Sequence, residues 1–199
     1  KNLFIENIEI RTEQDPDLEK YIQKKEVSYI DIELTEELKK VQVLLKEAYK
    51  EIVNNLKKYG LTKPTYLISR KDLLNFQNYL RKEISRGNRL AFSAISLVAQ
   101  AIKVGYSIEL VETQTIDSSY NFLKKLEEEP TKAAKNISKN KKIIEAKDIL
   151  KMTLEEGKEH PKISKLKEIV KKGITENKYA KIIIFANYRN TVDTIVKNL

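Results

Sequence analysis

Four lysines of the segment 36–59 are spaced so that they would lie along one line of a helix: Lys39, Lys46, Lys50 and Lys57. At about 100° per residue they fall within an arc of about 40°, and at about 1.5 Å per residue the line is about 27 Å long. Glu47 and Glu51 would lie about 100° away from it, so we expect this lysine stripe to be uncompensated. Such a stripe suits the phosphates of a duplex, whose charges recur every few ångströms.

The next segment, 70–87, repeats the arrangement. Its apolar residues recur at spacings of three and four and predict one buried face: Leu73, Phe76, Leu80 and Ile84. Its other side, and the residue position just beyond it, carry six cations: Arg70, Lys71, Arg81, Lys82, Arg86 and Arg89. No cluster of Asn and Arg opens a recognition helix, so the pattern favours contact with a sugar-phosphate backbone over base reading.

The positive charge is localised. The 199 residues include 38 Lys and Arg against 29 Asp and Glu, a net charge of +9. Residues 39–106 alone carry 14 basic and 4 acidic side chains, a net +10, whereas residues 1–38 carry 5 and 11, a net −6. This asymmetry favours a polyanionic partner. Two alternatives stay open from charge alone: basic faces that are only solvated, and basic faces that dock an acidic protein.

Few residue types here could perform catalysis. The chain has no cysteine and one histidine, His160, which excludes a thiolate nucleophile, a thiolate zinc site and a histidine-pair metal site. No GxxxxGK[ST] loop and no DExx box is present, so we predict that this polypeptide alone does not hydrolyse a nucleotide. We predict no catalytic residue and no metal ligand. His160-Pro161 is typical of a turn that starts a helix.

Helical periodicity accounts for most of the chain, and the predicted fold is mainly α. Thr35 and Gly60 would bound the first helix, and Ser69 to Asp72 resembles a capping box. The third helix is apolar nearly all round and is predicted to be central, whereas the lysine-rich segment 131–140 is predicted to be a loop. The six predicted helices cover residues 36–59, 70–87, 90–112, 117–128, 141–156 and 163–176.

Both chain ends are expected to be cut from flanking domains. Lys1 is not preceded by a start methionine, and no signal-peptide pattern follows. Ile182 to Phe185 is a continuous apolar run that suits a strand buried in a parallel sheet, followed by a helix over 191–199. Short strands at 8–10 and 29–34 are its possible partners. No apolar run approaches the about 20 residues of a membrane span, so we expect no membrane and a cytoplasmic location.

The order of these pieces resembles the archaeal Hef proteins, superfamily 2 helicases related to FANCM and XPF. The run from His160-Pro161-Lys162 through Lys181 to Phe185 is similar to the start of their second RecA-like domain, and the residues after it to motif IV. Ile8 to Arg11, with Asp17 and Tyr21, resembles the exit from the first RecA-like domain. Glu109 to Gln114 and Thr131 to Ala133 resemble the helical insert between them.

The resemblance implies a domain order. Residues 1–33 would leave the first RecA-like domain, residues 34–158 would be a thumb-like helical insert, and residues 159–199 would connect to the second RecA-like domain. The intact parent would use ATP and Mg²⁺ at motifs outside this chain, with none bound here. The motif IV residues Asn187, Tyr188, Arg189, Asn190 and Thr191 would touch phosphates of the tracking strand, although Asn187 and Thr191 also suit ordinary helix caps.

The combined hypothesis is a non-catalytic, DNA-binding region of an ATP-dependent helicase or translocase that acts on forked or branched DNA. Its partners would be forked or duplex DNA and the flanking RecA-like domains of the same chain. RIG-I-like RNA helicases carry a comparable insert, so an RNA helicase is one alternative. A protein-interaction module with solvated basic faces is another.

Overall fold

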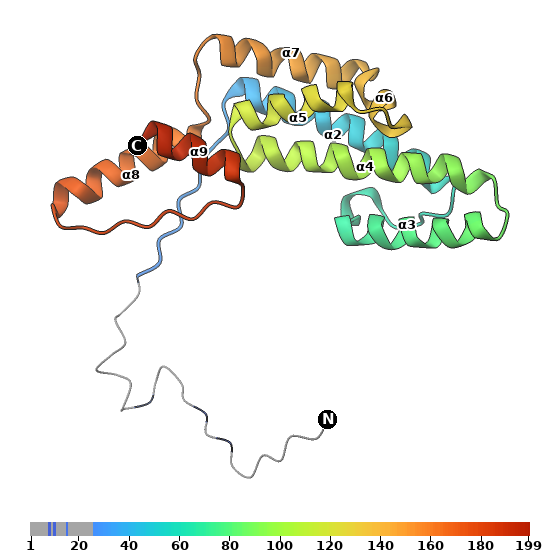
Figure 1. Cartoon of the computed structure of the whole chain (residues 1–199), viewed down its shortest axis with the longest axis horizontal. Coiled ribbons are helices and arrows are strands. Elements are labelled where there is room, and N and C mark those ends of the chain that lie inside the picture. Colours follow the sequence, from blue (N-terminus) through green and yellow to red (C-terminus); the bar gives the residue numbers. More distant parts are fainter. Residues whose placement is uncertain (1–7, 9, 11–14, 16–25) are drawn as a thin grey trace. The chain divides into compact units, whose positions relative to one another are not determined.

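The computed structural model of the chain describes residues 8, 10, 15 and 26–199. The chain divides into two units, Lys1–Asp31 and Ile32–Leu199, and every helix described below belongs to the second unit. The described residues form eight α-helices, so the prediction of a mainly α fold is confirmed and the predicted number of six is not (Figure 1). They are α2 (Glu36–Lys57), α3 (Arg70–Ser85), α4 (Leu90–Thr113), α5 (Ile116–Glu128), α6 (Lys132–Ser138), α7 (Lys141–Glu155), α8 (Pro161–Glu176) and α9 (Arg189–Asn198), with a 3₁₀ turn η1 (Thr65–Leu67) before α3.

The first two helices begin and end where their sequence signals predict. Thr35 caps α2 by accepting a hydrogen bond from the backbone N–H of Leu38, and Gly60 follows it with a φ of +98° that only glycine adopts readily. Ser69 and Asp72 form the predicted capping box of α3. Six apolar residues of α2 recur at spacings of three and four, and all of them are buried: Leu38, Val41, Leu45, Ala48, Ile52 and Leu56.

The central element is α4, which packs against α2, α3, α5 and α6. It has the length and hydropathy of a membrane span. Its packing gives another reason for that composition, because Ala94, Val98, Ala101 and Val104 are fully buried among the neighbouring helices. Tyr49 of α2 packs over Gly105, where a Cβ would lie at an ordinary contact distance of 3.5 Å from Cε2 of Tyr49.

The segment 131–140 is not the predicted loop but contains α6. Thr131 caps this helix by accepting a hydrogen bond from the backbone N–H of Ala134 at 3.3 Å. Ala133, Ala134 and Ile137 are buried against the bundle. The lysines on the exposed side made the segment polar overall, so the sequence did not predict this short apolar face.

The predicted strands are not found among the described residues. Residues 182–185 have no regular structure, and the side chains of Ile183 and Phe185 are 77% and 91% exposed. Residues 29–34 are likewise without a strand, and Glu9 of the third candidate lies outside the described residues. A strand needs a neighbour to pair with its backbone, and no neighbouring strand exists in the described part of the chain.

Candidate nucleic-acid interface

The cations of α3 are exposed and without acidic partners. The two carboxylates of this helix are already engaged: Asp72 accepts hydrogen bonds from Ser69 and an ion pair from Lys63 at 2.7 Å, and Glu83 binds Arg86 at 2.8 Å. The Lys63 ammonium group, with Ser69, holds the pKa of Asp72 well below its usual range. The other cations of this region have no carboxylate partner within the described residues. They are Arg70, Lys71, Arg81 and Lys82 of α3 and Arg89 before α4.

The lysine stripe of α2 is only partly uncompensated, which corrects the sequence prediction. Lys39 pairs with Glu36 at 3.0 Å and Glu33 at 3.4 Å, and these contacts, Glu36 first, raise its pKa. Lys46 pairs with Glu112 of α4 at 3.0 Å. Glu36 lies one turn earlier on α2, Glu33 precedes the helix and Glu112 lies on α4. The spacing of charges along one face of α2 therefore does not reveal these partners. Lys50 and Lys57 are exposed and have no ion pair within the described chain.

The side of the bundle formed with α7 has the opposite character. Lys142 of α7 binds Glu47 at 2.6 Å and Glu51 at 2.9 Å across the helix interface, so these two acids serve α7 and not their neighbours on α2. Lys40 reaches Glu145 at 3.0 Å. Charge on this side is therefore used for packing one helix on another.

Two more ion pairs extend the neutralised side. Lys147 of α7 pairs with Glu127 of α5, and Lys158 pairs with Glu37 at 2.6 Å. The Lys158 contact is the main cause that lowers the pKa of Glu37 to about 2. Seven of the ten cations that the sequence predicts to contact phosphates are exposed and have no ion pair among the described residues, and we call them the unpaired set: Lys50, Lys57, Arg70, Lys71, Arg81, Lys82 and Arg89.

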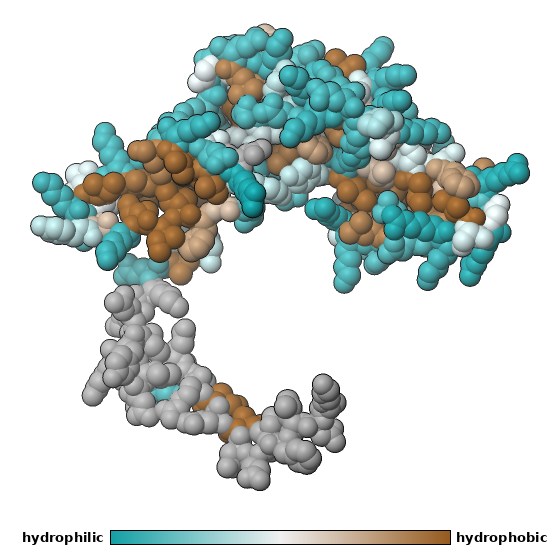
Figure 2. Space-filling model, viewed as in Figure 1, coloured by the Kyte–Doolittle hydropathy of each residue, from teal (hydrophilic) through white to brown (hydrophobic). Residues whose placement is uncertain are grey.

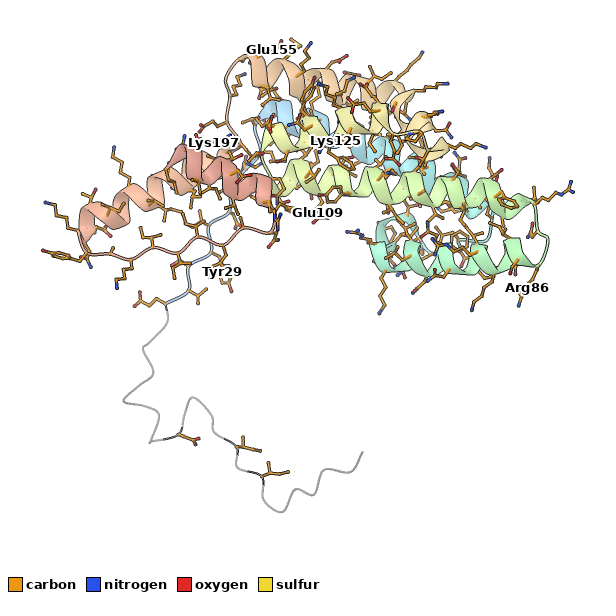
Figure 3. The ribbon with its side chains drawn as sticks, viewed as in Figure 1. Tyr29, Arg86, Glu109, Lys125, Glu155 and Lys197 are labelled. Atoms are coloured by element: carbon orange, nitrogen blue, oxygen red, sulfur yellow. The ribbon has the colours of Figure 1, made fainter. Side chains whose placement is uncertain are left out.

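The helix directions gather part of this set at one end of the bundle. Tyr49 of α2 faces Gly105 of α4, and Arg70 lines a cavity of about 160 Å³ with Tyr106 and Glu109. Both α2 and α3 therefore run antiparallel to α4, and the α3–α4 tip, residues 81–92, lies at the start of α4. Figure 3 shows Arg86 at this tip and Glu109 toward the other end of α4.

The motif IV segment is divided by its contacts. The Tyr188 hydroxyl donates to Glu109 Oε1 at 3.2 Å, its ring lies 6.1 Å from that of Tyr106, and burial followed by the Glu109 contact raises its pKa to about 12. The Thr191 hydroxyl is buried and donates to Gln114. Tyr188 and Thr191 thus hold the start of α9 on the last turns of α4.

Two other motif IV residues remain available at the surface. Asn187 and Arg189 are exposed, and no hydrogen bond or ion pair engages either side chain within the described part of the chain. The side chain of Asn190 lies outside the described residues. Neither Asn187 nor Thr191 caps α9 through its side chain, because the helix begins after Tyr188 without a side-chain cap.

His160 is a helix cap, as the sequence predicts. Its Nδ1 accepts from the backbone N–H of Lys162 at 3.2 Å, and its Nε2 lies 3.2 Å from the carbonyl oxygen of Val111. Nδ1 must be unprotonated to accept, so Nε2 carries the proton and donates to Val111. Burial lowers the pKa of this histidine and so keeps the ring neutral. The two hydrogen bonds of the ring join α8 to the end of α4.

The described residues do not fit an ATP–Mg²⁺ site. No three side chains of His, Cys, Asp or Glu gather among them in a way that could hold a metal ion. The five glycines of the sequence form no phosphate loop. What the described surface offers chemically is a set of fixed positive charges.

Sequence reasoning missed three features of this surface. Lys58 is also exposed and unpaired among the described residues. Glu109 accepts a hydrogen bond from Tyr188 and so holds the start of α9, a role that the sequence did not predict. Leu90 and Phe92 are 71% and 61% exposed at the start of α4. The sequence did contain a signal for this exposure. Both residues lie in the first turn after Gly87 and Arg89, where no neighbouring helix extends far enough to cover them.

Comparison with known proteins gives the class of protein, which is a helicase helical domain. A family model described as "Putative ATP-dependent RNA helicase, helical bundle" matches residues 37–159. The crystal structure of the Pyrococcus furiosus Hef helicase domain aligns with 98% of this chain and 42% of its own, at a TM-score of 0.83 and 34% identity.

Curated relatives agree with this assignment. A putative ATP-dependent RNA helicase of Methanocaldococcus jannaschii is 35% identical over 100% of the chain and 25% of its own length. An ATP-dependent DNA helicase of Neurospora crassa and the DEAD-box ATP-dependent RNA helicase FANCM of Arabidopsis thaliana are each 26% identical over 100% of the chain. The chain spans 18% and 15% of their lengths.

The chain belongs to the helical-bundle family of ATP-dependent helicases, as a Hef/FANCM-like helical domain. The resemblance to Hef predicted from the sequence is confirmed.

Proposed function

We propose that this region binds forked or branched DNA and positions it for an ATP-dependent helicase or translocase. The observation that carries the proposal is the unpaired set of cations on α2 and α3. Its seven side chains are exposed, while the carboxylates of α3 are occupied by Lys63 and Arg86. Cations without intramolecular partners bind phosphates with little competition and release the counterions of the nucleic acid.

The rest of the machine lies, in this proposal, in flanking parts of the intact protein. Residues 1–33 leave a first RecA-like domain, residues 34–158 form the insert, and residues 159–199 lead into a second such domain. ATP and Mg²⁺ bind between the motor domains of that protein, which acts in the cytoplasm. The chain spans a quarter or less of the length of its curated relatives, which supports this division.

The mechanism we propose for these residues is electrostatic and steric. The unpaired set holds the duplex backbone, and Asn187 and Arg189 contact phosphates of the tracking strand. Tyr188 and Thr191 fix the start of α9 on α4, so a movement of the second motor domain is transmitted to the helix that carries the insert. Held DNA is then moved past the tracking strand.

The relatives include both DNA and RNA helicases, and we propose DNA over RNA because of the likeness to Hef. A competition titration with forked DNA and forked RNA of the same sequence decides the matter. A preference for RNA would support the alternative of an RNA helicase insert.

The test of the DNA contact removes the charges of α3 in the intact protein. The variant replaces Arg70, Lys71, Arg81 and Lys82 by Gln, and the dissociation constant for forked DNA is measured against salt. Each lost phosphate contact lowers the slope of log K against log salt by about 0.9. The matched control replaces Lys151 and Lys172, exposed lysines of α7 and α8 whose pairs are loose at 3.7 Å.

An unchanged affinity and an unchanged salt slope in the α3 variant would contradict the proposal. That result, with retained binding to an acidic protein partner, would favour the protein-interaction module instead.

A further inference from the structure

Two large apolar side chains stand exposed at the α3–α4 tip. Leu90 and Phe92 are 71% and 61% exposed, whereas Ala91 and Ala94 beside them are buried in the core. Figure 2 shows apolar surface on this side of the bundle over α3 and α4, bordered by hydrophilic side chains. The fold does not need these two side chains for packing. They lie about 200° apart around the first turn of α4, and Phe92 is the aromatic one, so it is the candidate for contact with a flat apolar surface.

The surroundings of this apolar pair are cationic. Arg89 precedes Leu90 directly, and Lys82 and Arg86 come from the last turn of α3 and the turn after it. Arg89 and Lys82 have no acidic partner within the described residues, and Arg86 is tied only to Glu83 on its own helix. An occupant of this tip therefore offers apolar area at its centre and negative charge around it.

A nucleic acid has that combination at a branch. Along a continuous duplex the bases are stacked on one another and the outer surface is phosphate. Where the strands diverge, the last base pair presents its flat apolar face, with phosphates on both sides of it. Apolar and aromatic side chains stack on such faces without regard to sequence, and wedges of Phe or Leu also enter between base steps.

We propose that Phe92 stacks on the base pair at the branch point of a fork while Arg89, which has no ion pair among the described residues, holds an adjoining phosphate. This proposal rests on the proposed function and deepens it, since it names the part of the DNA that the tip reads. It gives the tip a role distinct from the rest of the unpaired set. The cations of α3 hold any duplex, and Phe92 distinguishes a fork from a continuous duplex.

The test compares two DNA substrates of equal length with the intact protein. One is a fork, and the other is a duplex closed at both ends by hairpin loops, which presents no open base pair. Phe92→Ala weakens binding to the fork by about tenfold and leaves binding to the closed duplex within about twofold. The salt slope stays unchanged because no phosphate contact is lost. Leu90→Ala, on another side of the same helix turn, leaves the preference for the fork unchanged.

The control is Met152→Ala on α7, a side chain that is 60% exposed and lies outside the tip; it changes neither affinity. A fork whose branch-point adenine is replaced by 2-aminopurine gives a second readout, because its fluorescence changes on binding to the unsubstituted protein and not to Phe92→Ala. Circular dichroism and the Tm show that the variants are folded.

The outcomes separate the two proposals. If Phe92→Ala keeps the ratio of fork to closed-duplex affinity of the unsubstituted protein, the stacking proposal is wrong. The same holds if its only effect is on self-association measured by sedimentation, which would make the tip a contact between copies. If the four α3 cations can be removed without loss of affinity, the proposed function itself is wrong, whatever Phe92 does.

Discussion

The α7 side and the α3 side of this bundle both carry many lysines and arginines, but they use them differently. On the α7 side several cations meet carboxylates of other helices, as in the pairs Lys142 with Glu47 and Lys40 with Glu145, although Lys141 has no ion pair in the described chain. On the α3 side the two available carboxylates bind Lys63 and Arg86, and the remaining cations face solvent. The same residue types thus serve assembly on one side and stand ready for an external anion on the other.

The difference teaches that net charge is a poor guide to a binding surface and that partners decide. A surface ion pair contributes little to stability, yet it removes a cation from competition for phosphate. The number of unpaired cations is therefore the quantity to compare between surfaces. Three predictions test this comparison and one tests the neutral cap that joins α8 to the bundle, in order from the largest expected effect to the smallest.

Reversing charge on the α3 side is expected to have the largest effect. The double change Arg81→Glu and Lys82→Glu lowers affinity for duplex DNA by about 100-fold or more near 0.1 M salt, because each lost phosphate contact costs about tenfold there. The Tm stays within about 2 °C. The mirror change on the other side, Lys40→Glu with Lys147→Glu, lowers the Tm and leaves affinity within about twofold. Equal losses of affinity in both variants would remove the distinction.

A second prediction applies the comparison within one helix. Lys50 is unpaired, whereas Lys46, one turn earlier, binds Glu112 at 3.0 Å. Lys50→Gln lowers affinity by about tenfold and the salt slope by about 1. Lys46→Gln leaves both nearly unchanged because its charge is already compensated. Fluorescence anisotropy titrations at several salt concentrations measure both values, and equal slopes in the two variants would refute the argument.

The sequence predicted the bundle well because its determinants are local. The capping box at Ser69 and the apolar spacing from Leu38 to Leu56 each involve residues within a few turns of one helix. The ion pairs could not be predicted in the same way. Glu112 reaches Lys46 from a helix 66 residues later in the chain, and its effect depends on how α2 and α4 cross.

The errors at the chain end have a related cause. The apolar run 182–185 has the composition of a strand, but a strand is completed by backbone partners that lie elsewhere, and none exists among the described residues. The segment 131–140 failed for the opposite reason. Its lysines predicted a loop, but Ala133, Ala134 and Ile137 are buried in the core.

A third prediction concerns the connection of α8 to the bundle, which relies on a neutral group. The pKa of His160 is lowered in the folded state by burial. Its contribution to stability is therefore complete above the unfolded pKa, about 6.5, and is lost as the pH falls through the lower folded value. His160→Ala removes the cap and lowers stability by about 1 kcal/mol at pH 8. Thermal unfolding between pH 8 and pH 5 shows the difference disappear, and a constant difference would contradict this role.

The smallest effect is expected where charge only joins two helices. Lys142→Gln breaks the contacts with Glu47 and Glu51 and lowers the Tm by about 2 °C at low salt, because exposed pairs contribute little. At 1 M salt the difference vanishes, since the screening length falls to about 3 Å. Lys141→Gln is the matched control, an exposed lysine of the same helix without an ion pair in the described chain, and its Tm should not depend on salt in this way. If Lys142→Gln instead reduces DNA affinity as Lys50→Gln does, the α7 side also contacts DNA, and pairing within the bundle does not decide which cations bind phosphate.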